Sequence, residues 1–209
     1  DSYFLFNSGV RMTYQALNQF NIAIEPRYTS IQHRLQYNET VSVGTTEKYI
    51  TSRLDQETLS AALRLNYALS PNLSIQYYAE PYISIGSYKD FSYVVNPLAR
   101  TQQEQLYFFD QKQLSMDGAK HQFLVDENKD GIADYQFADP NFAFTQFRSN
   151  LVLRWEYFPG SELFLVWSQG MTDYTISNFG IREGIDRQLF QKQAENTFLM
   201  KLTYRFIRE

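Results

Sequence analysis

The chain has 209 residues, of which 44% are hydrophobic and 17% aromatic, with no cysteine and a formal net charge of -4. A chain of this length and composition can build one substantial core or one medium-sized barrel, and it is not disordered, collagen-like or a coiled coil. The mild negative charge lacks the basic clusters of a nucleic-acid-binding protein, and the absence of cysteine excludes disulfides and thiolate metal sites. Sixteen tyrosines and seventeen phenylalanines against nine glycines favour many β-strands.

Alternation of apolar with polar residues begins near the start of the chain and predicts β-strands. Two alternating runs flank residues 17–19 and predict a first hairpin. Residues 31–54 are expected to continue as a long strand pair that turns near 40–45. The next run is the clearest, because every odd position from Leu59 to Leu69 is apolar.

A turn at residues 70–72 separates this run from a second alternating run over 73–85, so the two form a hairpin with long arms. Alternation returns at Gln146, and a further turn is predicted at 159–161. A last alternating run, over 196–206, lies near the end of the chain. Seven strands are therefore expected, roughly over residues 2–16, 19–39, 46–69, 73–86, 146–158, 162–171 and 196–206.

The connections fall into two lengths, and this asymmetry indicates the fold class. Short turns at Asn18, Pro71 and Pro159 contrast with long connections such as 87–145. Outer-membrane barrels sort their connections in this way, with short periplasmic turns and long extracellular loops. We therefore expect an all-β, antiparallel, transmembrane outer-membrane β-barrel, with the C-terminus in the periplasm. An interfacial aromatic girdle is expected at the short-turn end, from Tyr14, Tyr67, Trp155, Tyr157, Phe158, Tyr204 and Phe206.

No run of about 18 apolar residues occurs, so no transmembrane helix is expected. The mean hydropathy of -0.43 is that of a soluble protein, but lipid-facing and lumen-facing residues alternate in a barrel and cancel in the average. The chain begins at Asp1 without an initiator methionine or a signal-peptide pattern. Because single-chain barrels have an even number of strands, we expect residues 1–209 to be the C-terminal part of one larger barrel.

The last strand carries apolar residues at alternate positions up to the end of the chain. This pattern resembles the C-terminal signal that the outer-membrane barrel assembly machinery reads, although three further residues follow it. The resemblance assigns the signal to Phe198, Met200, Leu202, Tyr204 and Phe206.

A family resemblance is carried by FRSNLVLRWEY at 147–157, PGS at 159–161, LFLVWSQ at 163–169 and NTF at 196–198. These segments resemble a C-terminal outer-membrane barrel of unknown function from Bacteroidetes-type proteins that carry an N-terminal carbohydrate-binding module of the family-9 type. The resemblance extends from about Leu59 to Phe206. It implies a surface role linked to glycans, with the sugar contacts in the upstream module rather than in this chain.

Residues 126–134, within the predicted extracellular loop 87–145, have the spacing of a calcium loop. Oxygen ligands fall at positions 1, 3, 5 and 9, and Gly131 at position 6 provides the sharp turn. Phe137 stands where a calcium loop has its bidentate glutamate, so a solvated acidic turn is the alternative. A structural Ca²⁺ is predicted on Asp126, Asn128, Asp130, the Ile132 carbonyl and Asp134.

Charged residues of both signs fall on the polar side of the alternating strands. They predict either a surface that selects a solute or cross-strand ion pairs that stiffen the wall, and the second interpretation is favoured. The predicted lumen residues are Arg64, Glu80, Arg148, Arg154, Glu156, Lys201 and Arg205. Aromatic residues of the long loop are expected to pack it against its neighbours or to bind sugar rings, namely Tyr88, Phe91, Tyr93, Tyr107, Phe108 and Phe109.

Catalytic motifs are absent from the sequence, which has two histidines, His33 and His121, and no serine elbow, zinc helix or phosphate loop. We therefore expect no enzyme, but a membrane anchor or pore for a surface glycan-binding or uptake protein, with lipid and a glycan or surface lipoprotein as partners. The alternatives are the C-terminal barrel of a TonB-dependent nutrient transporter and a secreted β-sandwich lectin.

Overall fold

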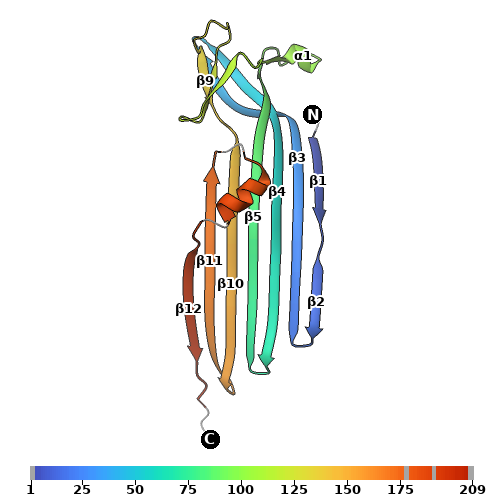
Figure 1. The fold of residues 1–209 in the computed structure, drawn as a ribbon, viewed down its shortest axis with the longest axis vertical. Coiled ribbons are helices and arrows are strands. Elements are labelled where there is room, and N and C mark those ends of the chain that lie inside the picture. Colours follow the sequence, from blue (N-terminus) through green and yellow to red (C-terminus); the bar gives the residue numbers. More distant parts are fainter. Residues whose placement is uncertain (1–2, 177–178, 190–191, 207–209) are drawn as a thin grey trace.

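The computed structural model describes residues 3–176, 179–189 and 192–206, and most of them lie in antiparallel strands (Figure 1). None of the helices in this part of the chain is long and apolar enough to cross a membrane. The elements are β1 (Tyr3–Gly9), β2 (Met12–Leu17), β3 (Phe20–Val43), β4 (Thr46–Ser70), β5 (Leu73–Val94), α1 (Gln102–Gln105), β6 (Leu106–Phe108), β7 (Leu114–Asp117), β8 (Gln122–Val125), β9 (Tyr135–Ala138), β10 (Phe142–Phe158), β11 (Ser161–Thr175), α2 (Ile181–Gly184), the π-helical turn η1 (Ile185–Leu189) and β12 (Glu195–Thr203).

One large sheet has the order β1-β3-β4-β5-β10-β11-β12, and β2 extends β1 along the same edge of β3. All seven expected strands therefore occur in this sheet, and the first of them is divided into β1 and β2. The turns that join β2 to β3, β4 to β5 and β10 to β11 lie together at one end, and β12 runs towards that end as well (Figure 1). Gly160 closes the last of these turns with φ +77, and a Cβ there would lie 2.6 Å from Arg205 Cδ.

In the lower part of the sheet the pairing register shifts only next to the tight turns, as between Ala68 and Ser70 and between Glu156 and Phe158, so elsewhere each row of paired residues faces one side. One such row joins Leu65, Tyr77, Leu151, Trp167 and Phe198. On the opposite face, the next row away from the tight turns carries polar residues, namely Arg64, Tyr78, Asn150, Ser168 and Thr197. The sheet thus has an apolar face and a polar face over its lower part, because side chains alternate along each strand.

Several expected boundaries are wrong. The strand expected at 2–16 is interrupted after Gly9, and β12 ends at Thr203 rather than at 206. The loop expected at 87–145 is shorter, because β5 continues to Val94 and β10 begins at Phe142. Ladder hydrogen bonds to neighbouring strands, which alternation does not reveal, extend these strands. Among the described residues, β1 and β12 remain the two edges of the sheet and do not pair with each other.

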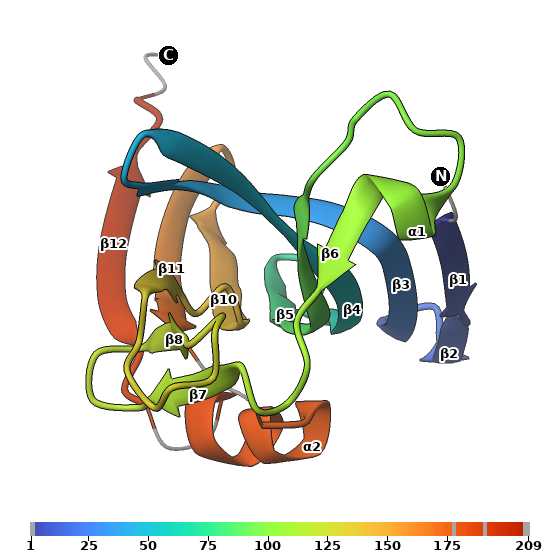
Figure 2. The ribbon, with the colours of Figure 1, turned by 90° about the horizontal axis from the view of Figure 1, so that it is seen from above.

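The segment between β5 and β10 folds into a cap with its own three-stranded sheet, β7-β8-β9. Its core is formed by Val125, Tyr135 and Phe137, which pack against Ile50 of β4 and Phe91 of β5. The β3–β4 hairpin extends beyond the other strands and crosses over one side of the sheet, whereas α2 lies on the other side (Figure 2). The long loop is therefore a packed unit built on the upper ends of β4 and β5.

A partly buried ion pair joins the cap to the β3–β4 hairpin. Lys48 Nζ lies 2.6 Å from Glu127 Oε2, and the side chains are 13% and 27% exposed. The Tyr93 hydroxyl donates to Glu127 Oε1 at 2.7 Å, and Lys48 Nζ lies 3.9 Å from the centre of the Tyr93 ring. Burial opposes ionisation of Glu127, but Lys48 and Tyr93 outweigh it and hold the pKa of this carboxyl below its usual value. The Glu127 carboxylate and the face of the Tyr93 ring therefore both stabilise the charge of Lys48.

Replacing Lys48 should release the cap from the hairpin. Lys48→Met leaves the Glu127 carboxylate without its cation, which costs about 2 kcal/mol for a partly buried pair, between the values for exposed and buried pairs. We expect faster amide hydrogen exchange in β7, β8 and β9 and no change in β10 and β11. Lys120→Met is the matched control, because this lysine is 70% exposed and lies 4.0 Å from Asp117. Equal exchange in the two variants would contradict the assigned role.

Acid should loosen the cap of the unaltered chain. Since folding lowers the pKa of Glu127, its contribution to stability is complete above the ordinary carboxyl pKa and is lost as the pH falls through the lower, folded value. Hydrogen exchange in β8 should therefore accelerate on acidification below about pH 4.5 in the unaltered chain more than in Glu127→Gln. Parallel acceleration in both proteins would show that another group controls the transition.

Candidate functional site

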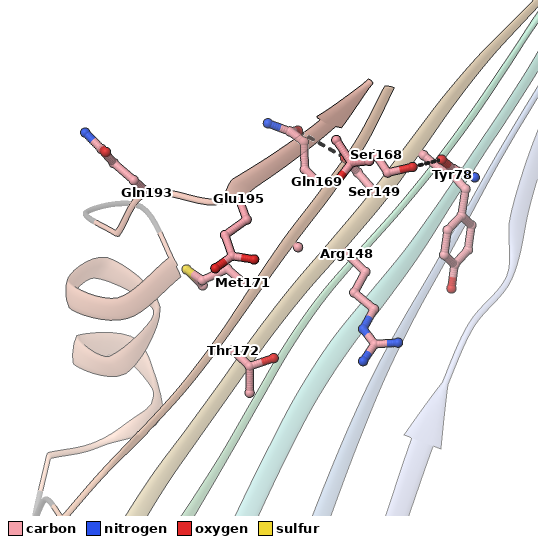
Figure 3. A pocket seen from close by; sticks show the side chains of 12 residues that line it. Tyr78, Arg148, Ser149, Ser168, Gln169, Met171, Thr172, Gln193 and Glu195 are labelled. Carbon is pink, nitrogen blue, oxygen red and sulfur yellow. Dashed lines mark hydrogen bonds between the residues drawn. The ribbon is translucent and has the colours of Figure 1, made fainter. Parts of the chain in front are cut away.

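The polar face holds a groove of about 740 Å³ across β10, β11 and β12 (Figure 3). Its floor lies at Gly170, which the register places between Arg148 of β10 and Glu195 of β12. A Cβ on Gly170 would meet no atom within 4 Å, so the missing side chain leaves open space between a cation and a carboxylate. Groove walls come from Tyr78, Asn150, Ser168, Thr172 and Thr197, among others.

The groove combines one aromatic ring, several hydroxyls and amides, and two opposite charges. Arg148, Thr172 and Tyr78 project to the same side of the sheet (Figure 3). The Ser168 hydroxyl donates to Asn150 Oδ1 at 2.6 Å, which fixes both side chains beside the hollow. Arg148 is exposed, and the described residues provide it with no ion pair, so its guanidinium remains available to an anion. Such a surface suits a hydroxyl-rich solute that carries a carboxylate.

The register places the predicted lumen residues of the strands on one face, as expected. Two of them form ion pairs: Arg154 with Glu162, where Nε lies 3.0 Å from Oε1, and Arg64 with Glu25 at 3.9 Å. Glu80 accepts a hydrogen bond from Tyr78. The other predicted residues do not pair with one another: Glu156 Oε1 accepts from the Gly160 amide at 2.9 Å, Lys201 lies 5.9 Å from the Phe164 ring, and Arg205 follows β12 beside Gly160.

The predicted calcium ligands hydrogen-bond to the backbone of their own loop. Asp126 Oδ2 accepts from the Gly131 amide at 2.7 Å, and Asn128 Oδ1 accepts from the Asp130 amide at 2.8 Å. Asp134 turns back to the Glu127 amide at 2.8 Å. Nowhere in the described residues do three or more His, Cys, Asp or Glu side chains gather closely enough to hold a metal ion. Backbone amides thus close the turn, and calcium binding stays a prediction.

The aromatic residues of the long loop mostly build the cap. Phe91, Tyr93 and Phe109 pack within its core, and Phe91 lies 5.1 Å from Phe137 between ring centres. Phe108 is exposed. The proposed assembly-signal residues Phe198, Met200 and Leu202 lie on β12 with exposed side chains, and Tyr204 and Phe206 follow the strand in contact with each other.

Sequence reasoning identified Arg148 but missed the rest of the groove. Glycine inside the alternating run of β11 was the available signal, because a strand glycine often marks a close approach to another molecule or a gap. Its neighbours across the sheet, Arg148 and Glu195, come from strands separated by a turn and by a long connection. Their juxtaposition depends on register and could not be read from spacing.

The fold and groove define an all-β protein with one long-stranded antiparallel sheet, an apolar face and a solute-sized polar hollow. A family model described as "Domain of unknown function (DUF5916)" matches residues 3–207, and the chain belongs to this family. Neither the curated proteins nor the solved structures include a match to this chain.

The groove should distinguish a sugar acid from a neutral sugar. In detergent micelles, glucuronate should give saturation-transfer NMR signals that Arg148→Gln weakens about tenfold, because the charge-assisted hydrogen bonds are lost. Glucose should respond little to this substitution. Arg27→Gln is the matched control, since Arg27 is already paired with Glu25 at 2.5 Å. Equal loss with both variants would mean that only the overall charge matters.

Calcium binding predicts a stabilisation that a chelator removes. At a dissociation constant of about 0.5 mM, typical of extracellular modules, 5 mM Ca²⁺ stabilises the folded state by about 1.4 kcal/mol. The melting temperature should rise in Ca²⁺ relative to chelator, and it should not rise in Asp130→Ser or with the same concentration of Mg²⁺. An unchanged melting temperature of the unaltered chain would eliminate the calcium prediction.

Proposed function

We propose that this chain is a wall segment of an outer-membrane β-barrel, and that it serves as a membrane anchor or pore for a surface glycan-binding or uptake protein. In this proposal the apolar face contacts lipid and the polar face contacts the lumen. The tight turns and the C-terminus lie in the periplasm, and the cap lies outside the cell. No chemical reaction is assigned to the chain.

The observation that carries the proposal is the division of one sheet face, along β4, into an apolar zone and a charged zone. Along β4 this face is apolar from Tyr67 to Leu59, which is nine residues, and then carries Glu57 and Asp55. Transmembrane barrel strands need about 9–11 residues to cross the bilayer. A soluble sandwich would bury this zone under a second sheet, whereas many of its large side chains are exposed, including Leu165 at 42% and Met200 at 72%.

Aromatic residues at the tight-turn end support the same orientation. Tyr67 packs edge-on against Phe20 at 5.6 Å between ring centres, and Trp155 packs against Tyr157 at 6.0 Å. Tyrosine and tryptophan are enriched where a membrane protein meets the headgroups, since their rings are apolar and their polar atoms reach water. The apolar zone, called the apolar band below, is therefore bordered by tyrosine and tryptophan next to the short turns.

The open edges and the groove support the proposed role. Unpaired backbone groups at β1 and β12 must find strand partners in hydrocarbon, so the wall requires further strands, which the proposal assigns to the same barrel. The groove with its unpaired Arg148 lies on the inner face, where a solute would pass. The link to glycans rests on the resemblance to barrels that follow a family-9-type carbohydrate-binding module.

Two further arrangements remain as alternatives, the barrel of a TonB-dependent transporter and a secreted lectin. The intact mass and peptides of the native protein, extracted from membranes, separate the first from our proposal. An upstream sugar-binding sandwich supports the proposal, and an upstream plug domain supports the transporter. Recovery of the folded protein in water without detergent would favour the lectin and overturn the membrane assignment.

Two adjacent positions of β10 test which face meets lipid. Leu151 lies within the apolar band, in the row of Leu65 and Tyr77, and Val152 lies on the polar face of the same strand. We expect Leu151→Arg to cost about 2 kcal/mol of folding free energy in lipid vesicles, because this position lies one row from the middle of the apolar zone and arginine costs about 2–4 kcal/mol at the bilayer midplane. Val152→Arg should change stability little, because the opposite face meets water. Equal effects, or the reverse order, would overturn the assignment of the faces.

A further inference from the structure

The helix between β11 and β12 lies on the apolar side of the sheet, at the upper limit of the apolar band. Ile181 and Ile185 pack on Ile83, Ile85 and their neighbours in β4 and β10. In the pairing register Ile83 faces Leu59, the last apolar residue of β4, and Ile85 faces Glu57, the first charged one. The helix therefore covers the boundary between the two zones.

The helix lies flat on the sheet because Gly184 has no side chain. A Cβ at this position would come within 2.6 Å of Ile83 Cδ1 and 3.1 Å of Ile85 Cδ1. Together α2 and η1 comprise nine residues, a length of about 13 Å, which matches the width of three adjacent strands. The helix thus forms a short ledge across β4, β5 and β10 on the convex side of the sheet (Figure 2).

The outer surface of this ledge is charged. Arg182, Glu183, Asp186 and Arg187 are exposed, while Gly184 is buried and Ile185 is half-buried. Arg187 lies 2.7 Å from Glu183, and the described residues give Arg182 no such partner. The ledge therefore has an apolar side, which packs on the sheet, and an outer side that carries arginine.

We propose that α2 and η1 lie in the headgroup layer of the membrane, on the lipid side of the wall, and that Arg182 and Arg187 bind anionic lipid phosphates. This inference rests on the proposed function, because it takes the apolar band as the lipid-facing zone. The inference depends on the position of the ledge. A helix that lies on the lipid-facing side, directly above an apolar band as thick as the membrane core, is level with the lipid headgroups. Arginine offers the fork of donors that a phosphate accepts.

Depth measurements by spin labelling test the position, and the absence of cysteine makes single labelling sites clean. Three variants are labelled in the vesicle-inserted protein: Asp186→Cys on the ledge, Leu165→Cys in the band and Glu104→Cys in the cap. We expect oxygen accessibility to dominate at 165, nickel-chelate accessibility to dominate at 104, and an intermediate ratio at 186. If the ratio of oxygen to nickel-chelate accessibility is that of water at 186 and that of hydrocarbon at 165, the inference about the ledge is wrong but the proposed function still stands. A water-like ratio at 165 overturns the proposed function.

Lipid selectivity tests the phosphate contacts. In nanodiscs of mixed phosphatidylglycerol and phosphatidylcholine, the protein should retain phosphatidylglycerol on delipidation. The double variant Arg182→Gln/Arg187→Gln should reduce this preference about fivefold per arginine. This factor corresponds to the attraction of about 1 kcal/mol between each basic residue and an anionic membrane surface. Lys120→Gln, in the cap, should leave the preference unchanged. Unchanged selectivity in the double variant, or equal loss in Lys120→Gln, would overturn the assignment of these arginines.

Discussion

The antiparallel register of the lower sheet is the constraint on which the other features of this protein depend. Side chains alternate between the two faces of each strand, so a one-residue slip would move an entire set of apolar residues to the other face. From β3 to β12 the rows of the lower sheet remain in phase. Both the apolar band and the polar groove exist because five successive pairings keep this phase.

Above the band, the sheet serves a different purpose, as the base of a cap. β4 and β5 extend past their neighbours and present Ile50 and Phe91 to the core of the three-stranded cap sheet. The Lys48–Glu127 pair then ties the cap to the β3–β4 hairpin. Since aromatic residues fill this core, the long segment after β5 is ordered by burial, and backbone amides close its acidic turn at 126–134.

The two faces divide the proposed function between them. On the apolar face, the band and the ledge formed by α2 and η1 would meet lipid tails and headgroups. On the polar face, Gly170 leaves a hollow between Arg148 and Glu195. A solute that carries a carboxylate and hydroxyls matches this hollow. The wall would thus combine anchoring with a weak preference among solutes.

The sequence by itself determined the strands, the tight turns and the two faces, because period-two alternation and turn residues such as Pro71 and Gly160 act over a few neighbouring positions. It also placed Arg64, Arg148 and Arg154 on one face. The tertiary structure alone decided what depends on contacts between distant segments: the cap core, the helix packed on the apolar side of the sheet at Gly184, and the alignment of Arg148, Gly170 and Glu195. Local patterns carry no information about which strands become neighbours or in which register, and those pairings created the groove.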